Sequence, residues 1–238
     1  MNKELCIARI GEQFAAFSSV VEAGSLRAKV PACPGWDLRQ LALHLAETYR
    51  WVRAALSSSQ EPTTPPTPAL DDGEIAFHLA GSAKALLTAL RSVDPLQPCW
   101  TMAPPDNAGF WLRRMVHETT IHRWDAQSSR AHPDPICPDL AYDGVREVAE
   151  MVIPRQVRLR RIAPLRHVLR LELTDVSQEV TLGRDGLRPD EQPDAWVSGP
   201  ADAMLLLLWK RIDATDPRLR FGGDPAAWQT LTSVAITP

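Results

Sequence analysis

Long apolar runs are missing from this chain of 238 residues. The longest unbroken apolar stretch runs from Ala203 to Trp209, far short of the ~20 apolar residues that a membrane-spanning helix needs. The first 14 residues carry charges where a signal peptide would have its apolar stretch. We therefore expect a soluble, cytoplasmic protein.

An excess of positive charge is also missing. The 26 Lys and Arg residues are outnumbered by 29 Asp and Glu residues, so the formal net charge is −3. Proteins that bind nucleic acid usually show the opposite imbalance, and nucleic acid is not an expected partner. Apolar residues make up 45% of the chain, which is enough to build a core and excludes global disorder.

Cysteine is scarce and scattered. The four cysteines are Cys6, Cys33, Cys99 and Cys137, and no two of them form a C-x-x-C pair. This spacing argues against a cysteine zinc site and against a disulfide framework, as expected in a reducing compartment. We expect these side chains to be small apolar residues in or near the core.

The first half of the chain predicts a helical bundle. Apolar residues recur there at intervals of three and four, which is the pattern of an amphipathic helix. Proline-rich segments, which cannot be helical, interrupt the pattern. The predicted helices cover residues 3–22, 37–56, 71–91 and 108–127. Four helices of this length joined by loops predict a four-helix bundle.

The second half predicts a smaller α+β domain. A polar, proline-rich stretch at residues 128–139 is a candidate linker, and a helix is expected after it at 139–153. Apolar residues then alternate as in strands, and a leucine-rich helix is expected from Pro200 to Arg211. The predicted strands cover residues 166–173, 179–183 and 195–197. We expect two domains, at residues 1–130 and 138–238.

A possible metal site lies on the fourth predicted helix. His117 and His122 are five residues apart, so they project about 140° apart and cannot share one ion. Glu118 and His122 are four residues apart, and their Cβ atoms are expected to lie about 5–6 Å apart on one face. Such a pair can bind a metal, although it also occurs as an ordinary surface ion pair.

His44 is the best candidate for a third ligand. It lies on the second predicted helix, next to the apolar stripe that includes Leu41 and Leu45, so it is expected to face the bundle or its edge. One carboxylate and two imidazoles on facing helices form a chemically reasonable site for a divalent metal. Three protein ligands leave a coordination position open, as in catalytic sites.

Three ordered segments resemble the mycothiol-dependent maleylpyruvate isomerase family. VPACPGWDLRQLALHLAETYRW (Val30–Trp51) is similar to its first signature, V-P-x-C-P-G-W-x-x-x-x-L-x-x-H-L. WLRRMVHETTIHRWDAQ (Trp111–Gln127) is similar to the second signature, H-E-x-x-x-H-R-x-D-A, and SGPADAMLLLLWKRID (Ser198–Asp213) to the C-terminal motif. The resemblance implies a DinB-like metal-binding bundle followed by a domain similar to sterol carrier proteins.

The resemblance also implies the site and the chemistry. The family's metal ligands correspond to His44, Glu118 and His122, with zinc as the expected metal, although this ligand set also suits nickel, cobalt or iron. Mycothiol is the implied cosubstrate, since a coordinated thiol is deprotonated and becomes a nucleophile. Arg211 corresponds to the family's arginine for thiol or carboxylate recognition, and we assign it a catalytic role. Arg123 and Asp125 are expected to support the ligands or to form ion pairs between domains.

Three functions remain open at this point. The first is an enzyme that adds a thiolate to a small electrophile, giving isomerisation or S-transfer. The second is a hydrolase that uses metal-bound hydroxide. The third is a non-catalytic carrier that holds a small apolar ligand. A requirement for added thiol would separate the first from the second, and the third predicts no turnover. The sequence leaves the physiological substrate and the oligomeric state undetermined.

Overall fold

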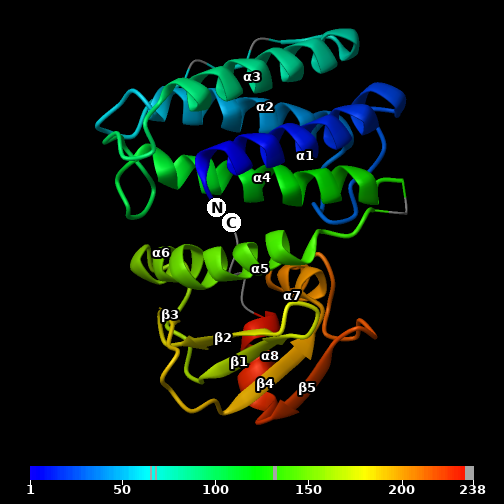
Figure 1. Ribbon diagram of the computed structural model, residues 1–238. Helices are drawn as coiled ribbons and strands as arrows, with labels where there is room; N and C mark the ends of the chain where they lie inside the picture. The colour runs from blue at the N-terminus through cyan, green and yellow to red at the C-terminus, as the bar shows by residue number, and fades with distance from the viewer. Residues whose placement is uncertain (65, 68, 131–132, 234–238) are drawn as a thin grey trace. The chain divides into compact units, whose positions relative to one another are not determined.

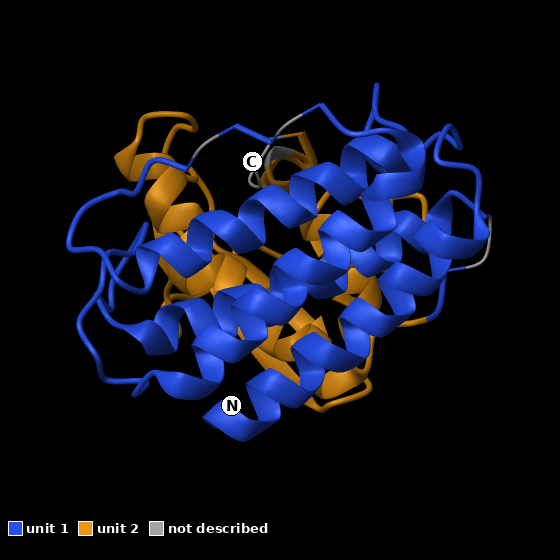
Figure 2. Ribbon diagram, turned by 90° about the horizontal axis from the view of Figure 1, so that it is seen from above, with its two compact units in different colours: residues 1–134 blue, residues 135–238 orange. Residues whose placement is uncertain are grey.

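The computed structural model describes residues 1–64, 66–67, 69–130 and 133–233. The chain divides into two compact units, Met1–Asp134 and Pro135–Pro238 (Figure 2). Three predicted segments fall partly outside the described residues. These parts are Pro65 and Pro68 of a proline-rich loop, residues 131–132 of the linker, and residues 234–238 of a last helix that the sequence predicts from Asp224.

The first unit consists of four long helices, as predicted (Figure 1). Helix α1 packs against α4 and α3, and α2 packs against α3 and α4, so apolar faces from all four helices meet in one core. The helices are α1 (Lys3–Ala23), α2 (Leu38–Ala55), α3 (Asp72–Ser92) and α4 (Ala108–Ser128). No helix among the described residues is both long and apolar enough to cross a membrane.

A tight turn and a cap fix the beginning of α2. Gly35 has a φ of +87°, a conformation that glycine adopts without steric cost, and it reverses the chain after Pro34. Asp37 then accepts a hydrogen bond from the backbone N–H of Gln40, and the Gln40 side chain accepts one from the backbone N–H of Asp37. This capping box satisfies backbone donors at the helix start and places His44 about two turns into α2.

Helix α4 is the most buried of the four. Its core-facing residues include Trp111 and Met115, and several polar side chains are buried with them. The buried hydroxyl groups of Thr119 and Thr120 have hydrogen-bond partners within α4, because each donates to the backbone carbonyl four residues earlier. Few helices with so many polar residues are buried on most of their sides. Because buried polar groups are nearly always hydrogen-bonded, the polar side chains of α4 are expected to have specific partners.

The second unit begins with a helical run that changes its winding. Helix α5 (Pro138–Glu147) continues into the π-helical turn η1 (Val148–Val152) and then into α6 (Ile153–Arg158). The sequence predicts one helix here, ending at residue 153. Pro154 explains the difference in winding, since it has no N–H to donate within a regular helix and its ring crowds the preceding turn.

A five-stranded mixed sheet follows, with the strand order β3-β2-β1-β4-β5. Strands β1 and β4 pair in parallel, and the other neighbours are antiparallel. The first predicted strand begins at Leu169 rather than Arg166, and the two-residue strand β3 was not predicted. The strands are β1 (Leu169–Leu173), β2 (Gln178–Gly183), β3 (Gly186–Leu187), β4 (Ala195–Gly199) and β5 (Arg220–Gly223).

The leucine-rich helix is shorter than predicted. Helix α7 (Ala201–Leu208) ends three residues before Arg211, so the placement of Arg211 within the helix is wrong. Lys210 adopts a φ of +58°, and the backbone N–H groups of Lys210 and Arg211 donate to the carbonyls of Leu207 and Leu206. This is a Schellman ending with lysine where glycine is usual, and it turns Arg211 into the following loop. Helix α8 (Pro225–Ser233) comes last.

Replacing Asp37 by alanine tests the cap that positions α2. The Asp37→Ala variant loses the side-chain acceptor for the backbone N–H of Gln40, and we expect a loss of about 1 kcal/mol in the free energy of unfolding. Urea denaturation measures this difference. Asp37→Asn is the matched control, since it keeps an acceptor oxygen and should lose less. Equal losses in the two variants would contradict the capping role.

Candidate metal centre

The three predicted ligands converge on one point of the first unit. Helix α2 contributes His44, and α4 contributes Glu118 and His122. One ligand atom from each lies within 4.8 Å of the other two. The Nε2 atoms of His44 and His122 lie 3.3 and 3.2 Å from the same carboxylate oxygen, Oε1 of Glu118. The structure thus brings together the residues that helical spacing had grouped.

These separations suit a small divalent cation. Ligand atoms about 2.0–2.2 Å from a zinc ion at tetrahedral angles lie about 3.3–3.6 Å from one another. The two Nε2–Oε1 distances in this chain are 3.3 and 3.2 Å. Two imidazole nitrogens and one carboxylate oxygen also form a donor set that zinc and neighbouring transition metals accept. The donor types present, and the two distances to Oε1, therefore fit the ion that the sequence predicts.

Asp125 holds His122 in the orientation that metal binding requires. Its Oδ2 atom lies 2.9 Å from Nδ1 of His122, and the Asp125 side chain is fully buried. A carboxylate only accepts hydrogen bonds, so Nδ1 carries the proton and Nε2 is left for the metal. Cys33 donates to the same Oδ2 atom at 3.5 Å, so the turn before α2 also contacts this carboxylate.

Arg114 holds the other oxygen of Glu118. Its Nη2 atom donates to Oε2 at 2.6 Å, and the arginine side chain is buried on the preceding turn of α4. A charge-assisted hydrogen bond of this kind is strong and directional. It leaves Oε1 as the oxygen that faces both histidines. Arg114 was not among the residues predicted from the sequence, although an arginine four residues before a glutamate on a helix indicates an ion pair.

The charges of the cluster are strongly coupled. Burial by itself would raise the pKa of Glu118, but the charge of His122 and hydrogen bonds from His122 and His44, together with Arg114, hold this pKa well below its ordinary value. Burial alone would lower the pKa of His122, yet the charge of Glu118 and the bond to Asp125 raise it to about 9. The cluster therefore keeps a carboxylate ionised and a positive charge beside it.

The centre is more open on one side than on the others. The side chains of Glu118 and His122 are 14% and 8% exposed, whereas that of His44 is 38% exposed. The ring of Trp36 lies 5.1 Å from the His44 ring and is itself half-buried. A ligand would therefore reach the three donor atoms from the side of His44 and Trp36.

Other residues of the second signature have structural roles. His117 is buried in the core and does not belong to the cluster, as predicted. Arg123 donates to the Gln13 and Gln127 side chains and to the backbone carbonyl of Asp134, so it ties α4 to α1 and to the following segment. The prediction that Arg123 supports the ligands or forms an ion pair between domains stays a prediction.

Arg211 lies in the second unit, whereas the three predicted ligands belong to the first. Its Nη1 atom donates to the backbone carbonyl of Trp209, and its guanidinium carbon lies 5.9 Å from the centre of the Trp209 ring. Arg211 also lines a hollow of about 520 Å³ with neighbours that include Lys210 and Thr215. The structure therefore places Arg211 at a surface hollow, where it is accessible to a ligand.

This fold defines a class of protein: a four-helix bundle, in which three side chains could hold a metal ion, followed by a small α+β unit. Comparisons with known proteins agree with this arrangement of domains. The model of the mycothiol maleylpyruvate isomerase N-terminal domain matches residues 7–127, and that of the MDMPI C-terminal domain matches residues 139–230. The chain therefore belongs to the mycothiol-dependent maleylpyruvate isomerase family, which is a family of enzymes, as predicted.

Solved structures support the fold. The chain is similar to a crystal structure of the mycothiol-dependent maleylpyruvate isomerase, with a TM-score of 0.69 and 12% sequence identity over 94% of this chain and 95% of that one. A histidine-to-alanine mutant of the mycothiol-dependent maleylpyruvate isomerase gives a TM-score of 0.64 at 13% identity over 87% and 88% of the two chains. No curated protein matches the sequence.

Removing the carboxylate behind His122 tests how the centre is oriented. In the Asp125→Asn variant, the amide can present its N–H₂ to Nδ1 and favour the wrong tautomer, so we expect zinc affinity to fall by about 10- to 100-fold. Competition with a chromophoric chelator measures the affinity. Ser128→Ala is the matched control, because that hydroxyl donates to the backbone carbonyl of Asp125 and not to its carboxylate. Unchanged affinity in Asp125→Asn would contradict the orienting role.

The coupled charges predict a pH dependence of the protein stripped of metal by a chelator. The pKa of His122 in the folded chain, about 9, lies above the ordinary 6.5, so the fold binds this proton more tightly than the unfolded chain does. The resulting stabilisation is complete below about pH 6.5 and is lost as the pH rises through about 9. Urea denaturation between pH 6.5 and 9.5 should therefore show a steeper loss in the wild type than in His122→Gln. Parallel curves would contradict the coupling.

Proposed function

We propose that this chain is a metal-dependent enzyme that uses mycothiol, a low-molecular-weight thiol, to isomerise a small organic acid carrying an electrophilic double bond. The observation that carries the proposal is the convergence of His44, Glu118 and His122 within 4.8 Å. Family membership and the likeness to solved mycothiol-dependent isomerases support the thiol. The cytoplasmic location predicted from the sequence is compatible with a reduced thiol.

The residues of the first unit would hold the ion and leave room beside it. His44 and His122 would each bind through Nε2, and Glu118 through Oε1, while Asp125 and Arg114 keep these groups in place. A divalent ion bound there, which we propose to be zinc, lowers the pKa of a coordinating thiol and makes it a nucleophile at neutral pH. Three protein ligands leave a position for that thiol.

Isomerisation then requires no net consumption of the thiol. The thiolate forms a C–S bond to one alkene carbon, and the π electrons move to the other carbon and onto the adjacent carbonyl group. Rotation about the resulting single bond is followed by cleavage of the C–S bond, which restores the double bond in the other geometry. A thiol that is consumed would instead indicate S-transfer at the same site.

Arg211 is proposed to recognise a carboxylate of the substrate or of the thiol. A guanidinium group can donate two parallel hydrogen bonds to a carboxylate, and the Arg211 side chain lines a surface hollow. We expect Arg211→Lys to raise KM more than it lowers kcat, because lysine keeps the charge and loses the paired geometry. Steady-state kinetics with the carboxylate substrate test this expectation. An unchanged KM would remove Arg211 from the site.

Metal content is the first test of the proposed enzyme. We expect about one equivalent of zinc or a similar divalent ion in untagged wild-type protein, and its loss in the His44→Ala/His122→Ala variant. Elemental analysis measures both. Wild-type protein that folds fully but binds neither zinc nor nickel would overturn the proposal and favour the carrier function.

Activity is the second test. The metal-loaded wild type should isomerise maleylpyruvate, or another cis-alkenoic acid conjugated to a carbonyl, only when mycothiol is present and without consuming it. Turnover without thiol would instead identify a hydrolase or another metal-dependent reaction. Glu118→Gln should abolish metal-dependent turnover, whereas Glu12→Gln on the exposed surface of α1 should not.

A further inference from the structure

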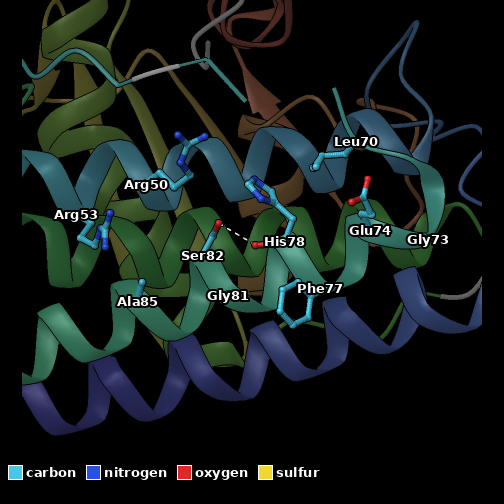
Figure 3. Close-up of a pocket in the computed structure, with 10 residues that line it drawn as sticks. All are labelled: Arg50, Arg53, Leu70, Gly73, Glu74, Phe77, His78, Gly81, Ser82 and Ala85. Atoms are coloured by element: carbon cyan, nitrogen blue, oxygen red, sulfur yellow. Dashed lines mark hydrogen bonds between the residues drawn. The ribbon is translucent and has the colours of Figure 1, made fainter. Parts of the chain in front are cut away.

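The side of α2 that borders α3 is separate from the metal centre. Figure 3 shows this side, with Arg50 and Arg53 of α2 along a hollow between the two helices. Within α3, the Ser82 hydroxyl donates to the backbone carbonyl of His78 at 2.9 Å. None of the residues labelled there is one of the three clustered ligands. The contacts that adjust the metal centre are therefore expected elsewhere, and the turn before α2 provides one.

The turn before α2 is fixed by hydrogen bonds between its own backbone groups. The N–H of Cys33 donates to the carbonyl of Val30 at 3.0 Å, and the N–H of Trp36 donates to the carbonyl of Cys33 at 2.9 Å. The N–H of Val30 closes the turn by donating to the carbonyl of Trp36 at 3.1 Å. The half-buried Cys33 side chain is thus presented from a defined backbone conformation.

The Cys33 thiol contacts the carboxylate that orients a metal ligand. Its Sγ atom lies 3.5 Å from Oδ2 of Asp125, a residue 92 positions later in the chain. A carboxylate only accepts hydrogen bonds, so the thiol is the donor. The same Oδ2 atom accepts from Nδ1 of His122 at 2.9 Å. Two donors therefore meet at one oxygen, and together they limit how the carboxyl group can turn.

The burial of Asp125 makes the second donor important. The Asp125 side chain has an exposed fraction of 0%, and a buried carboxylate is costly unless donors compensate its charge. Removing the thiol would take one donor from this charge without giving the carboxylate access to water. The carboxyl group would then turn more readily, and Nδ1 of His122 would lose a fixed partner.

We propose that Cys33 is a positioning residue of the metal centre, whose thiol holds the Asp125 carboxylate in the orientation that presents Nε2 of His122 to the ion. This inference rests on the proposed metal-dependent function. Trp36, at the end of the same turn, lies with its ring 5.1 Å from the ring of His44. One short segment thus contacts the first histidine directly and reaches the second histidine through Asp125.

Zinc affinity is the first measurement, by competition with a chromophoric chelator. We expect Cys33→Ala to weaken zinc binding about threefold to tenfold, which is the effect of one hydrogen bond. Cys33→Ser differs from this variant by one hydroxyl donor and should lose less affinity. Cys99→Ala is the matched control, since Cys99 is a buried cysteine of the same unit and is not one of the three clustered ligands. Equal losses in Cys33→Ala and either of the other two variants would overturn the proposal.

A double-mutant cycle tests whether Cys33 acts through Asp125. In the Asp125→Asn background, Cys33→Ala should weaken zinc binding by less than about twofold, because the bond that orients His122 is already lost. A purely structural effect of Cys33→Ala would lower the affinity by the same factor in both backgrounds. That result would also overturn the proposal.

A measurement on metal-free protein separates this inference from the proposed function. Wild-type protein that binds no zinc would overturn the metal-dependent enzyme. The NMR signal of the His122 Nδ1 proton, however, reports the hydrogen bond to Asp125 without a metal. This signal should shift in Cys33→Ala and keep its position in Cys99→Ala. If the signal keeps its position in Cys33→Ala as well, Cys33 does not position Asp125, and the inference fails whatever the metal content.

Discussion

The carboxylate of Glu118 is the group around which the centre of the first unit is organised. Its Oε1 atom faces the imidazoles of His44 and His122, and its Oε2 atom accepts from Arg114. A buried carboxylate is costly unless its charge is compensated, and here three side chains provide compensation. Two of the three are histidines, whose ring nitrogens can bind a metal ion. The third is an arginine that cannot lose its proton, so it keeps Glu118 ionised with or without the metal.

This arrangement explains why α4 is both polar and buried. A helix that only supported the fold would place apolar residues at such positions, since a hydrophobic pair of similar size is often more stable than a buried ion pair. Arg114, His122 and Asp125 instead form a connected set of hydrogen bonds through the interior. The interior therefore gives up some stability for a fixed arrangement of donor atoms, as binding and catalytic sites commonly do.

The clustering of His44, Glu118 and His122 was predictable because helical geometry is regular. The spacing of Glu118 and His122 required no knowledge of the fold, and His44 followed from its position beside an apolar stripe. The resemblance to the family implies all three residues as metal ligands. Cys33 was not predicted to contact Asp125, because the path of the turn before α2 depends on tertiary packing. The interior partner of Glu118 could have been found, since Arg114 precedes it by four residues on the same helix.

The errors in the second unit have local physical causes. The end of α7 was placed too late because Lys210 occupies a left-handed position at which glycine would have signalled the helix end. The π-helical turn was missed because its five residues continue an apolar helical pattern, and only Pro154 marks the change. A two-residue strand such as β3 is too short for alternation to be visible, and it exists only because β2 provides hydrogen-bonding partners.

Helix α2 presents different faces to its two neighbours. His44 and Arg53 are nine residues apart, which places them about 180° apart around the helix. One face therefore approaches α4 at the metal centre, and the opposite face borders α3. The capping box at Asp37 fixes the start of α2, and the buried hydrogen bond between Tyr49 and Thr119 joins α2 to α4. The distance from His44 to Glu118 and His122 thus depends on how α2 is held against α4, because no single helix carries all three side chains.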